Sequence, residues 1–557
     1  MRKRLLAIAF AFVLILGLIL WRLVGVQILE HKQWLSQAKS AQERTVEIPS
    51  RRGRIYDRNG NLLALNKKAY SIAIDSYNMT KPEILIEILQ QHLDRESQEL
   101  EELVYRQSYF TWIERQVEYE VAMDIKDAAE EAEARGLIFV DGWKRVYPYQ
   151  DLAGHILGFT GLDGQGLAGL EYSMNQELSG EPEIKKMIYG ADQVPYRETI
   201  IQQSTPGADV HLTIDSTIQH VTETEIKEGV EKFEAKQGWA IVMDPRNGEV
   251  LAMAQDETYD PNRYKESPPE RQSNLPLSTT FEPGSILKVF TALAALEEGV
   301  ASPQTVVNGD SPIQISNHNV HNSQYKDWGQ VTLEEVITHS INTGMIRIAQ
   351  RLGQANLYDF LNKAGFGSKT GIELSGEESG NLRPLRSWSD LAIGAVSIGQ
   401  SLSVTAIQLI SRMAAVANGG ELIEPTVVKS LEKGGNKIDN PRTDSYQGRL
   451  ASQKTVEEVK TMLRQVVVEG TGQTADIPGF EVCSKSGTAQ KAQPGGGYYS
   501  DRYISSFAGF FPKESPRFLI LVVLDEVGTK PVWGGETAGE VFRQIAVRIG
   551  KSDRNPD

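Results

Sequence analysis

The hydrophobic pattern of the chain begins with one long apolar run near the N-terminus. Basic residues at positions 2–4 precede it, and the run extends from Leu5 to Leu20, with an apolar pattern continuing to Gly25. About twenty helical residues at roughly 1.5 Å each cover roughly 30 Å, enough to cross a bilayer. This length favours an uncleaved anchor over a signal peptide, whose apolar core is shorter. We therefore expect a single-pass protein of the cytoplasmic membrane, with its N-terminus in the cytoplasm and the chain after about residue 28 outside.

Apolar positions in the second half predict helices packed around a sheet. Residues 216–233 have the pattern of a long helix, and residues 285–299 are almost entirely apolar, which predicts a buried helix. Strand patterns occupy residues 238–252, as a hairpin, and residues 507–511 and 518–524. The predicted fold class is α+β, with an antiparallel sheet flanked by helices.

The first half combines helical and strand patterns. Residues 81–135 are predicted to be helical, Tyr70–Asp75 has the pattern of a strand, and Thr205–Gly207 has the composition of a hinge. The expected segments are a cytoplasmic tail with a transmembrane helix at 1–27, a first domain at 28–205, a second domain at 206–550 and a disordered polar tail at 551–557.

Charge excludes one class of partner. The net charge of −15 arises from 58 basic and 73 acidic residues, and much of the acidic excess lies between Glu96 and Glu133. We interpret that stretch as a solvated helical surface. The chain has no basic patch beyond its N-terminus, so nucleic acid is not an expected partner.

The residues that commonly bind metals or form disulfides are few. Cys483 is the single cysteine, so no internal disulfide is expected in an exported domain. It lies two residues before Lys485, a pattern that favours a small buried strand residue over a catalytic thiol. His318 and His321 are the only close histidine pair, and they have no third ligand at a suitable spacing. We predict neither a metal site nor a cofactor.

Three short polar segments carry candidate chemistry. They are Ser285-Ile-Leu-Lys288, Ser340-Ile-Asn342 and Lys485-Ser-Gly-Thr488. Pro283-Gly284 breaks the chain, so a helix is expected to begin at Ser285 and to place Lys288 on the same face, one turn later. A hydroxyl beside an amine is a nucleophile beside a base. Alone, each segment is typical of a helix cap, a turn or a loop, and only their joint order favours catalysis.

The amine of Lys288 must lose its proton before it can act as a base. The reference pKa of lysine is about 10.4, so burial or a second cation, for which Lys485 is a candidate, has to lower it. Gly487 has no side chain to hold a substrate backbone away. The expected catalytic residues are Ser285 as nucleophile, Lys288 as base, Ser340 as proton relay, Asn342 as a holder of a carbonyl or of the lysine, and Lys485 as a carboxylate-binding cation. The expected substrate-binding residues are Ser486, Gly487 and Thr488. The backbone N–H groups of Ser285 and Thr488 are expected to face an oxyanion.

The order of the three segments resembles the series found in penicillin-binding proteins and class A β-lactamases. Arg52–Ala64, Arg145–Tyr149 and Gly169–Glu171 resemble stretches of the non-catalytic domain of class B penicillin-binding proteins, and residues 238–252 resemble the first hairpin of their transpeptidase sheet. The chain departs from the family pattern at four positions in or next to the segments, which are Ile286, Leu287, Ser484 and Ser486. A serine keeps the hydroxyl of the usual threonine at position 486, so carboxylate binding is expected to survive.

The resemblance implies a D,D-transpeptidase. Residues 28–205 would be a non-catalytic pedestal or dimerisation-type domain, and residues 206–550 a penicillin-binding transpeptidase domain with a serine β-lactamase-like fold. Ser285 would attack the D-Ala-D-Ala amide of a peptidoglycan stem peptide carried by lipid-linked glycan, and β-lactam antibiotics would acylate the same serine. Expected partners are a separate membrane glycan polymerase and proteins of the division machinery.

Class B includes division, elongation and sporulation types. Trp112–Arg115 and the modest length resemble the division and sporulation types, and we expect the septal division enzyme, with the elongation and sporulation types as alternatives. A D,D-carboxypeptidase or β-lactamase-type hydrolase shares all three segments, but the long N-terminal domain and the anchor favour a transferase. A non-catalytic division scaffold is a third alternative, and the three intact segments argue against it.

Overall fold

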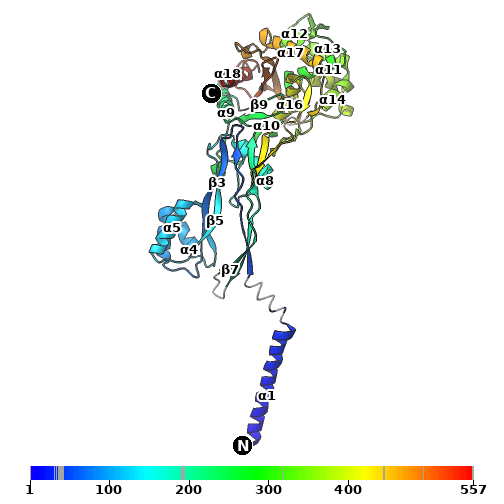
Figure 1. The fold of residues 1–557 in the computed structure, drawn as a ribbon. Helices are drawn as coiled ribbons and strands as arrows, with labels where there is room; N and C mark the ends of the chain where they lie inside the picture. Colours follow the sequence, from blue (N-terminus) through cyan, green and yellow to red (C-terminus); the bar gives the residue numbers. More distant parts are fainter. Residues whose placement is uncertain are drawn as a thin grey trace. The chain divides into compact units, whose positions relative to one another are not determined.

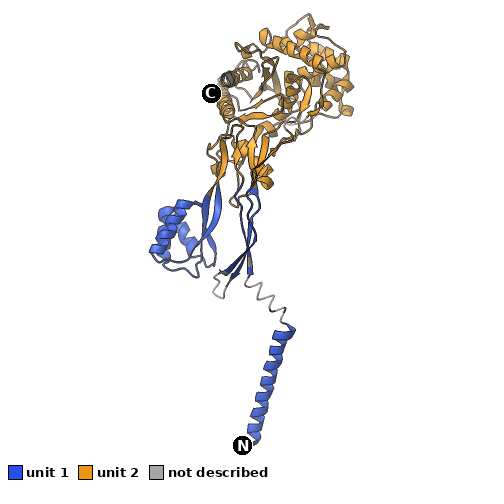
Figure 2. Ribbon diagram, viewed as in Figure 1, with its two compact units in different colours: residues 1–52, 68–144, 179–207 blue, residues 53–67, 145–178, 208–557 orange. Residues whose placement is uncertain are grey.

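The computed structural model describes residues 2–30, 32, 34, 43–189, 195–316, 318–442, 446–493 and 495–554. The chain divides into two compact units (Figure 2). Unit 1 comprises residues 1–52, 68–144 and 179–207, and unit 2 comprises residues 53–67, 145–178 and 208–557. All three segments with candidate chemistry therefore lie in unit 2.

The chain begins with helix α1 (Arg2–Val24), which a π-helical turn, η1 (Gly25–Leu29), continues (Figure 1). Together they form the one helix of the described chain that is long and apolar enough to cross a membrane. No residue of α1 is buried by other parts of the structure. The predicted N-terminal apolar helix is confirmed.

The core of unit 1 joins three helices to strands. Helices α3 (Pro82–His92), α4 (Ser97–Val104) and α5 (Tyr119–Glu131) bury apolar side chains against the part of β3 (Leu62–Ile74) that follows Lys67, β4 (Thr111–Glu118) and β5 (Leu137–Val146). A second, antiparallel sheet contains β1 (Glu43–Ile48), β6 (Glu183–Tyr189) and β7 (Pro195–Gln202).

The predicted helical stretch at residues 81–135 is wrong at its centre, where β4 interrupts it. Thr111 and Ile113 are buried and Trp112 is exposed, which is the period of two that a strand requires. Trp112–Arg115 therefore lies in a strand.

Unit 2 is built on a five-stranded sheet whose neighbours are all antiparallel, as predicted. Its order is β10 (Val250–Gln255), β9 (Gln237–Met243), β21 (Phe518–Asp525), β20 (Tyr498–Phe511) and β19 (Cys483–Ala492). Alternate residues of β21 enter two different hydrophobic cores, with Leu519 and Leu521 on one face and Ile520 and Val522 on the other. Both faces are covered, which explains the uninterrupted apolar run of this strand.

Helices cover the two faces of the sheet (Figure 1). On one face pack α9 (Ser216–Lys232) and α18 (Ala538–Arg554), and the core on the other face includes α11 (Lys288–Glu297), α16 (Ala406–Ala417) and α17 (Gln453–Val468). Every residue of α11 up to Leu296 is buried, which confirms the predicted buried helix.

Further elements of the chain are α6 (Gly154–Leu157), α7 (Gly169–Ser173), α8 (Asn175–Ser179), α10 (Leu275–Ser278), α12 (Leu333–Thr338), α13 (Asn342–Leu352), α14 (Gln354–Lys363), α15 (Asp390–Ser397), β2 (Ile55–Tyr56), β8 (Asp209–Leu212), β11 (Val306–Asn308), β12 (Ile313–Ile315), β13 (His318–Val320), β14 (Gln330–Thr332), β15 (Glu421–Ile423), β16 (Val428–Lys433), β17 (Asn436–Asp439) and β18 (Tyr446–Arg449).

Two stretches of the first half of the chain, residues 53–67 and 145–178, belong to unit 2 rather than to the unit that contains the anchor. Arg145 and Glu171 form a buried ion pair of 2.6 Å, and Arg145 also donates to the carbonyl of Gly53 at 2.7 Å. A Cβ on Gly53 would lie 1.8 Å from the carbonyl oxygen of Ala208, so this close approach requires glycine. The compact units therefore do not follow one cut of the chain at residue 205.

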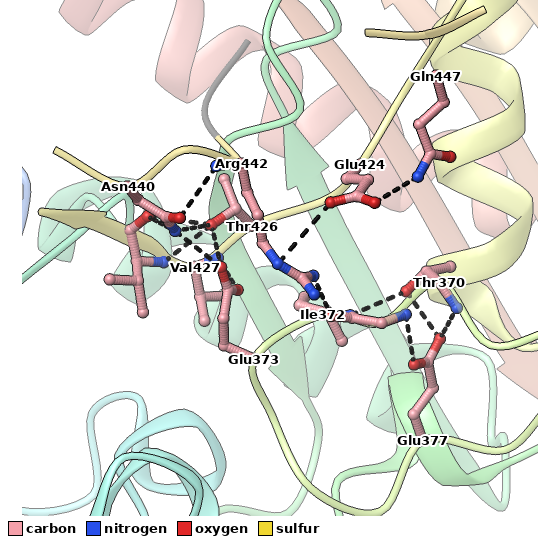
Figure 3. A network of polar contacts seen from close by, with 12 residues as sticks. Thr370, Ile372, Glu373, Glu377, Glu424, Thr426, Val427, Asn440, Arg442 and Gln447 are labelled. Atoms are coloured by element: carbon pink, nitrogen blue, oxygen red, sulfur yellow. Dashed lines mark hydrogen bonds and ion pairs between the residues drawn. The ribbon is translucent and has the colours of Figure 1, made fainter. Parts of the chain in front are cut away.

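Polar contacts hold the irregular stretch between α14 and α15 (Figure 3). Glu377 is buried and accepts hydrogen bonds from Thr370 N at 2.6 Å, Thr370 Oγ1 at 2.7 Å and Gly371 N at 3.0 Å. Glu373 accepts from Thr426 Oγ1 at 2.6 Å. Glu377 therefore satisfies backbone donors within the stretch, and Glu373 joins the stretch to Thr426.

The end of this stretch is joined to the residues before α16. Asn381 and Ser403 exchange two backbone hydrogen bonds, of 2.8 and 3.1 Å. Gln408 of α16 donates to the carbonyls of Ser368 and Ser379. These bonds join Ser403 and the first turn of α16 to the irregular stretch.

Helix α18 continues to Arg554, so the first residues of the predicted disordered tail are helical. The apolar stripe of this helix, which packs against α9 and the sheet, ends at Ile549. The rest of the predicted tail, residues 555–557, lies outside the described residues.

Candidate active site

Ser285 lies in a 3₁₀ turn, η4 (Gly284–Leu287), and the α-helix begins only at Lys288. The predicted helix start at Ser285 is therefore early by one turn. Gly284 has a φ of +54°, and a Cβ there would lie 3.2 Å from the carbonyl oxygen of Thr488. The chain thus enters the helix through a tight turn pressed against β19, and Ser285 is half-buried there.

The amine of Lys288 is buried and lies between carbonyl oxygens. It donates to the Ser340 carbonyl at 2.6 Å and to Asn342 Oδ1 at 2.7 Å, and it lies 3.2 Å from Ser340 Oγ. Among the described contacts, the Ser285 hydroxyl is not one of its hydrogen-bond partners. Burial, and secondarily the charge of Lys485, lowers the pKa of Lys288 well below its usual value. These are the two causes that the sequence analysis named.

Ser340 connects α12 to α13 with a backbone that is rare for its type. Its φ is +58°, in the left-handed region that favours glycine, and residues held there cluster at functional sites. This conformation places Ser340 Oγ between two amines, 3.2 Å from Lys288 Nζ and 3.0 Å from Lys485 Nζ.

Asn342 is the first residue of α13 and is fixed at both ends of its amide. Its Oδ1 accepts from Lys288, and its Nδ2 donates to the carbonyl of His321 at 2.9 Å. The amide therefore holds the lysine, which is one of the two roles expected from the sequence. His321 contributes to this arrangement through its backbone.

Lys485 extends from β19 and is fully buried. Its amine donates to Ser340 Oγ at 3.0 Å and to the carbonyl of Ser486 at 3.1 Å. Burial lowers the pKa of Lys485 to about 7. The structure thus brings Lys288, Ser340, Asn342 and Lys485 into one hydrogen-bonded cluster beside the turn of Ser285.

The residues after Lys485 contact the protein itself. Ser486 Oγ lies 2.8 Å from Thr471 Oγ1, and Thr488 Oγ1 accepts from Gly534 N at 2.9 Å. A Cβ on Gly487 would lie 2.3 Å from Ser506 Oγ and 2.9 Å from the carbonyl oxygen of Pro283. Glycine is thus required by the protein's own packing, which differs from the reason expected from the sequence.

Cys483 is a buried strand residue. Its Sγ lies 3.4 Å from the carbonyl oxygen of Lys460, and burial raises the pKa of its thiol to about 12. A thiol with so high a pKa is not a nucleophile at neutral pH. Sequence reasoning missed the carboxylate of Glu282, three residues before Ser285, and its only signal was a charged residue between Phe281 and Pro283.

Two family models match the sequence. The penicillin binding protein transpeptidase domain matches residues 238–546, and the penicillin-binding protein dimerisation domain matches residues 47–212. The first match contains all three segments of the cluster, and the two matches together confirm the predicted fold class.

Similar proteins match over most of the chain. Stage V sporulation protein D of Bacillus subtilis is 31% identical, over 99% of this chain and 87% of its own length. The peptidoglycan D,D-transpeptidase FtsI homolog of Mesostigma viride is 31% identical, over 96% of this chain and 94% of its own length. A crystal structure of penicillin binding protein 3 from Mycobacterium tuberculosis, complexed with aztreonam, is 28% identical, with a TM-score of 0.70 over 92% of this chain and 98% of that chain.

The transpeptidase match alone covers more than half of the chain, and the dimerisation match precedes it in the order that class B proteins share. One relative is named as a sporulation protein and the other as a peptidoglycan D,D-transpeptidase FtsI homolog, so the relatives do not resolve the type within class B. The chain belongs to the class B penicillin-binding proteins, and it is a peptidoglycan D,D-transpeptidase.

Proposed function

We propose that Ser285 is the nucleophile of this transpeptidase and that Lys288 is its general base. The observation that carries the proposal is the environment of the buried amine. Among the described residues Lys288 has no carboxylate partner, and its two shortest bonds run to carbonyl oxygens, at 2.6 and 2.7 Å. A neutral amine has two N–H groups, and these two acceptors use both. Its lone pair is then available for a hydroxyl proton.

Ser340 is proposed to relay the proton. Its hydroxyl oxygen accepts from Lys485 Nζ at 3.0 Å and lies 3.2 Å from Lys288 Nζ, so it can also accept from the protonated amine while its own proton is donated onward. A proton that Lys288 takes from Ser285 can therefore leave through Ser340. The left-handed backbone of Ser340 keeps the hydroxyl at this bridge.

Acylation and transfer follow from these roles. The Ser285 oxygen attacks the carbonyl carbon between the two terminal D-Ala residues of a stem peptide, and its proton passes to Lys288. The C–N bond breaks, the terminal D-Ala leaves with the proton returned through Ser340, and an ester to Ser285 remains. An amine of a second stem attacks this ester and forms the cross-linking amide, and a proton returns to the serine oxygen.

The remaining groups are proposed to bind the donor stem. Lys485 and the Ser486 hydroxyl bind the terminal carboxylate, and the backbone N–H groups of Ser285 and Thr488 face the developing oxyanion. Gly487 lets β19 approach the turn of Ser285 closely. A β-lactam enters the same first step, because its amide imitates the dipeptide, and it leaves an ester on Ser285.

Labelling with a fluorescent penicillin tests this proposal. The wild-type chain, Ser285→Ala and the control Ser368→Ala, which changes an exposed serine of the same unit, are incubated with the probe and followed with time. We expect a stable label on the wild type and the control and none on Ser285→Ala. Rapid turnover of the label would indicate a hydrolase, and an unlabelled wild type would contradict the proposed site.

The setting of the reaction is a second part of the proposal. Basic residues in the first turn of α1, before its apolar run, favour a cytoplasmic N-terminus. With that orientation the catalytic unit would lie outside the cytoplasmic membrane, where stem peptides on lipid-linked glycan are cross-linked. Expected partners are a membrane glycan polymerase and division proteins. The resemblance of Trp112–Arg115 supports a septal role. Septal enrichment of the tagged protein is expected, whereas a uniform sidewall signal, or synthesis only during sporulation, would contradict this role.

A further inference from the structure

A carboxylate outside the three segments lies at the base of the turn that carries Ser285. Glu282 Oε1 accepts hydrogen bonds from Ser401 N at 2.9 Å and from the Tyr498 hydroxyl at 3.1 Å. Its second oxygen, Oε2, is buried and has no hydrogen-bond partner among the described residues. One side chain thus joins three segments that are far apart in sequence, which are the turn before α11, the loop after α15 and the beginning of β20.

The loop after α15 packs directly against this turn. Gly284 N donates to the Gly399 carbonyl at 3.1 Å, and Phe281 and Val404 exchange two backbone hydrogen bonds of 2.9 Å. A Cβ on Gly399 would lie 1.9 Å from the carbonyl oxygen of Gly284, so the two backbones touch at this point. Movement of the loop would therefore move the backbone immediately before Ser285.

The loop contains a residue with a strained backbone, Ser401. Glu282 accepts a hydrogen bond from the backbone N–H of this residue. Ser401 has a φ of +63°, a left-handed conformation that is unfavourable for a residue with a side chain. Such conformations persist where the surroundings over-determine them. The bond from Ser401 N to Glu282 is a contact of that kind, because it anchors the strained peptide to the nucleophile turn.

The bond to Tyr498 extends the connection to the hairpin of β19 and β20. Tyr498 is the first residue of β20 and pairs with Ala492 of β19, the strand that also contains Lys485–Thr488. Burial, followed by the charge of Glu282, raises the pKa of the Tyr498 hydroxyl to about 12, so this hydroxyl remains a donor at neutral pH. Glu282 is therefore bonded both to the 399–401 loop and to the β19–β20 hairpin.

We infer that Glu282 is a positioning residue that sets the turn of Ser285 against the 399–401 loop and the β19–β20 hairpin. The inference rests on the proposed role of Ser285 as the nucleophile. Glu282 acts through the backbone, so its loss should slow the acylation step without changing the affinity of the first, non-covalent complex. A misplacement of about 1 Å at a reacting group can cost roughly 10²-fold in rate.

The test separates binding from acylation in the full-length protein. Stopped-flow labelling with a fluorescent penicillin yields the dissociation constant and the acylation rate constant of Glu282→Ala, Glu282→Gln and Tyr498→Phe. We expect Glu282→Ala to lower the rate constant by roughly 30- to 100-fold, with the dissociation constant within about twofold of wild type. Glu282→Gln keeps a carbonyl oxygen that can accept both bonds, so its rate should return to within about threefold of wild type. Tyr498→Phe removes one of the two bonds and should fall between them.

Glu298→Ala, which changes an exposed glutamate at the end of α11, is the matched control and should resemble wild type. Acylation by Glu282→Ala within twofold of wild type would overturn the inference, as would a Glu282→Gln variant as slow as Glu282→Ala. If the alanine variant does not fold, a Tyr498→Phe variant with a wild-type rate constant overturns it instead. A wild-type chain that is not labelled, or a Ser285→Ala variant that is, contradicts the proposed nucleophile. If labelling depends on Ser285, the proposed nucleophile stands. A wild-type acylation rate constant in Glu282→Ala then contradicts only the positioning role of Glu282.

Discussion

Two of the buried sets of charged side chains in unit 2 differ in one respect, because a counter-charge compensates the first and not the second. Arg145 and Glu171 are 4% and 0% exposed at their side chains, and they form an ion pair of 2.6 Å. Lys288 and Lys485 are equally buried, but within the described residues their amines contact only carbonyl, amide and hydroxyl oxygens. Both sets are polar clusters in a packed interior, yet their consequences differ.

The difference teaches how burial is used. A buried cation with a carboxylate partner can hold two segments together, as Arg145 does by contacting both Gly53 and Glu171. A buried cation without such a partner is easier to deprotonate, and a deprotonated lysine can act as a base. The first arrangement is expected to contribute to stability, and the second to reactivity at a cost in stability.

The largest expected effect comes from Lys288→Met, which removes the proposed base at nearly constant volume. Acylation by fluorescent penicillin should fall by roughly 10²- to 10⁴-fold, the range for loss of a general base. The melting temperature should not fall, because the variant no longer deprotonates a buried amine. A wild-type acylation rate would contradict the role of Lys288.

The pH dependence of stability provides the control for this variant. The pKa of Lys288 is lower in the folded than in the unfolded chain, so between these two values the unfolded chain binds one more proton. Wild-type stability from this group therefore rises with pH across that interval. Lys288→Met should lack that contribution in urea denaturation at several pH values, and an unchanged pH profile would contradict the assignment.

Glu171→Gln breaks the compensated set and should have the opposite signature. It leaves Arg145 buried without its counter-charge, a change that costs about 3–5 kcal/mol of unfolding free energy in buried pairs. Folded molecules should still acylate within about twofold of wild type. The matched control is Glu99→Gln, which breaks a partly exposed pair with Arg95 of 2.9 Å and should cost only about 0.2–1 kcal/mol. Equal losses for the two variants in urea denaturation would contradict the comparison.

Local patterns explain why the sequence predicted the frame of the molecule. The buried helix α11, the antiparallel strands and the spacing of Ser285 and Lys288 follow from periodicities that a short window of residues contains. The position of β4 was missed because acidic helix formers surround a short alternating stretch, and a window that averages over them indicates a helix.

The parts that were not predicted depend on contacts between distant segments. The left-handed backbone of Ser340 is fixed by the lysines of two other elements, and the bonds of Glu282 to Ser401 and Tyr498 join residues 119 and 216 positions apart. The packing around Gly487 has the same origin, since Ser506, from a neighbouring strand, fills the space that a side chain would take. Such arrangements have no signature in the local sequence.

The pH profile of acylation should reveal the titration of Lys485, with a smaller change in rate than the loss of Lys288 causes. The pKa of Lys485 is about 7, so its charge, and with it the attraction for a ligand carboxylate, diminishes above that pH. The second-order acylation constant should fall by up to about tenfold per pH unit on the alkaline side. A β-lactam whose carboxylate is esterified should show a flatter profile. An equal decline for both probes would contradict the role of Lys485.

The smallest effect is expected at Cys483, which shares β19 with Lys485 but cannot gain a charge by accepting a proton. Burial raises the pKa of this thiol to about 12, so it stays neutral, and a neutral group costs little to bury. Cys483→Ala should lower the unfolding free energy by about 1 kcal/mol, as expected for one small core side chain. Its acylation rate should stay within about twofold of wild type, and iodoacetamide should not modify the folded wild-type chain at neutral pH. Rapid alkylation of Cys483, or a large loss of activity in Cys483→Ala, would contradict the interpretation of this thiol as an inert core side chain.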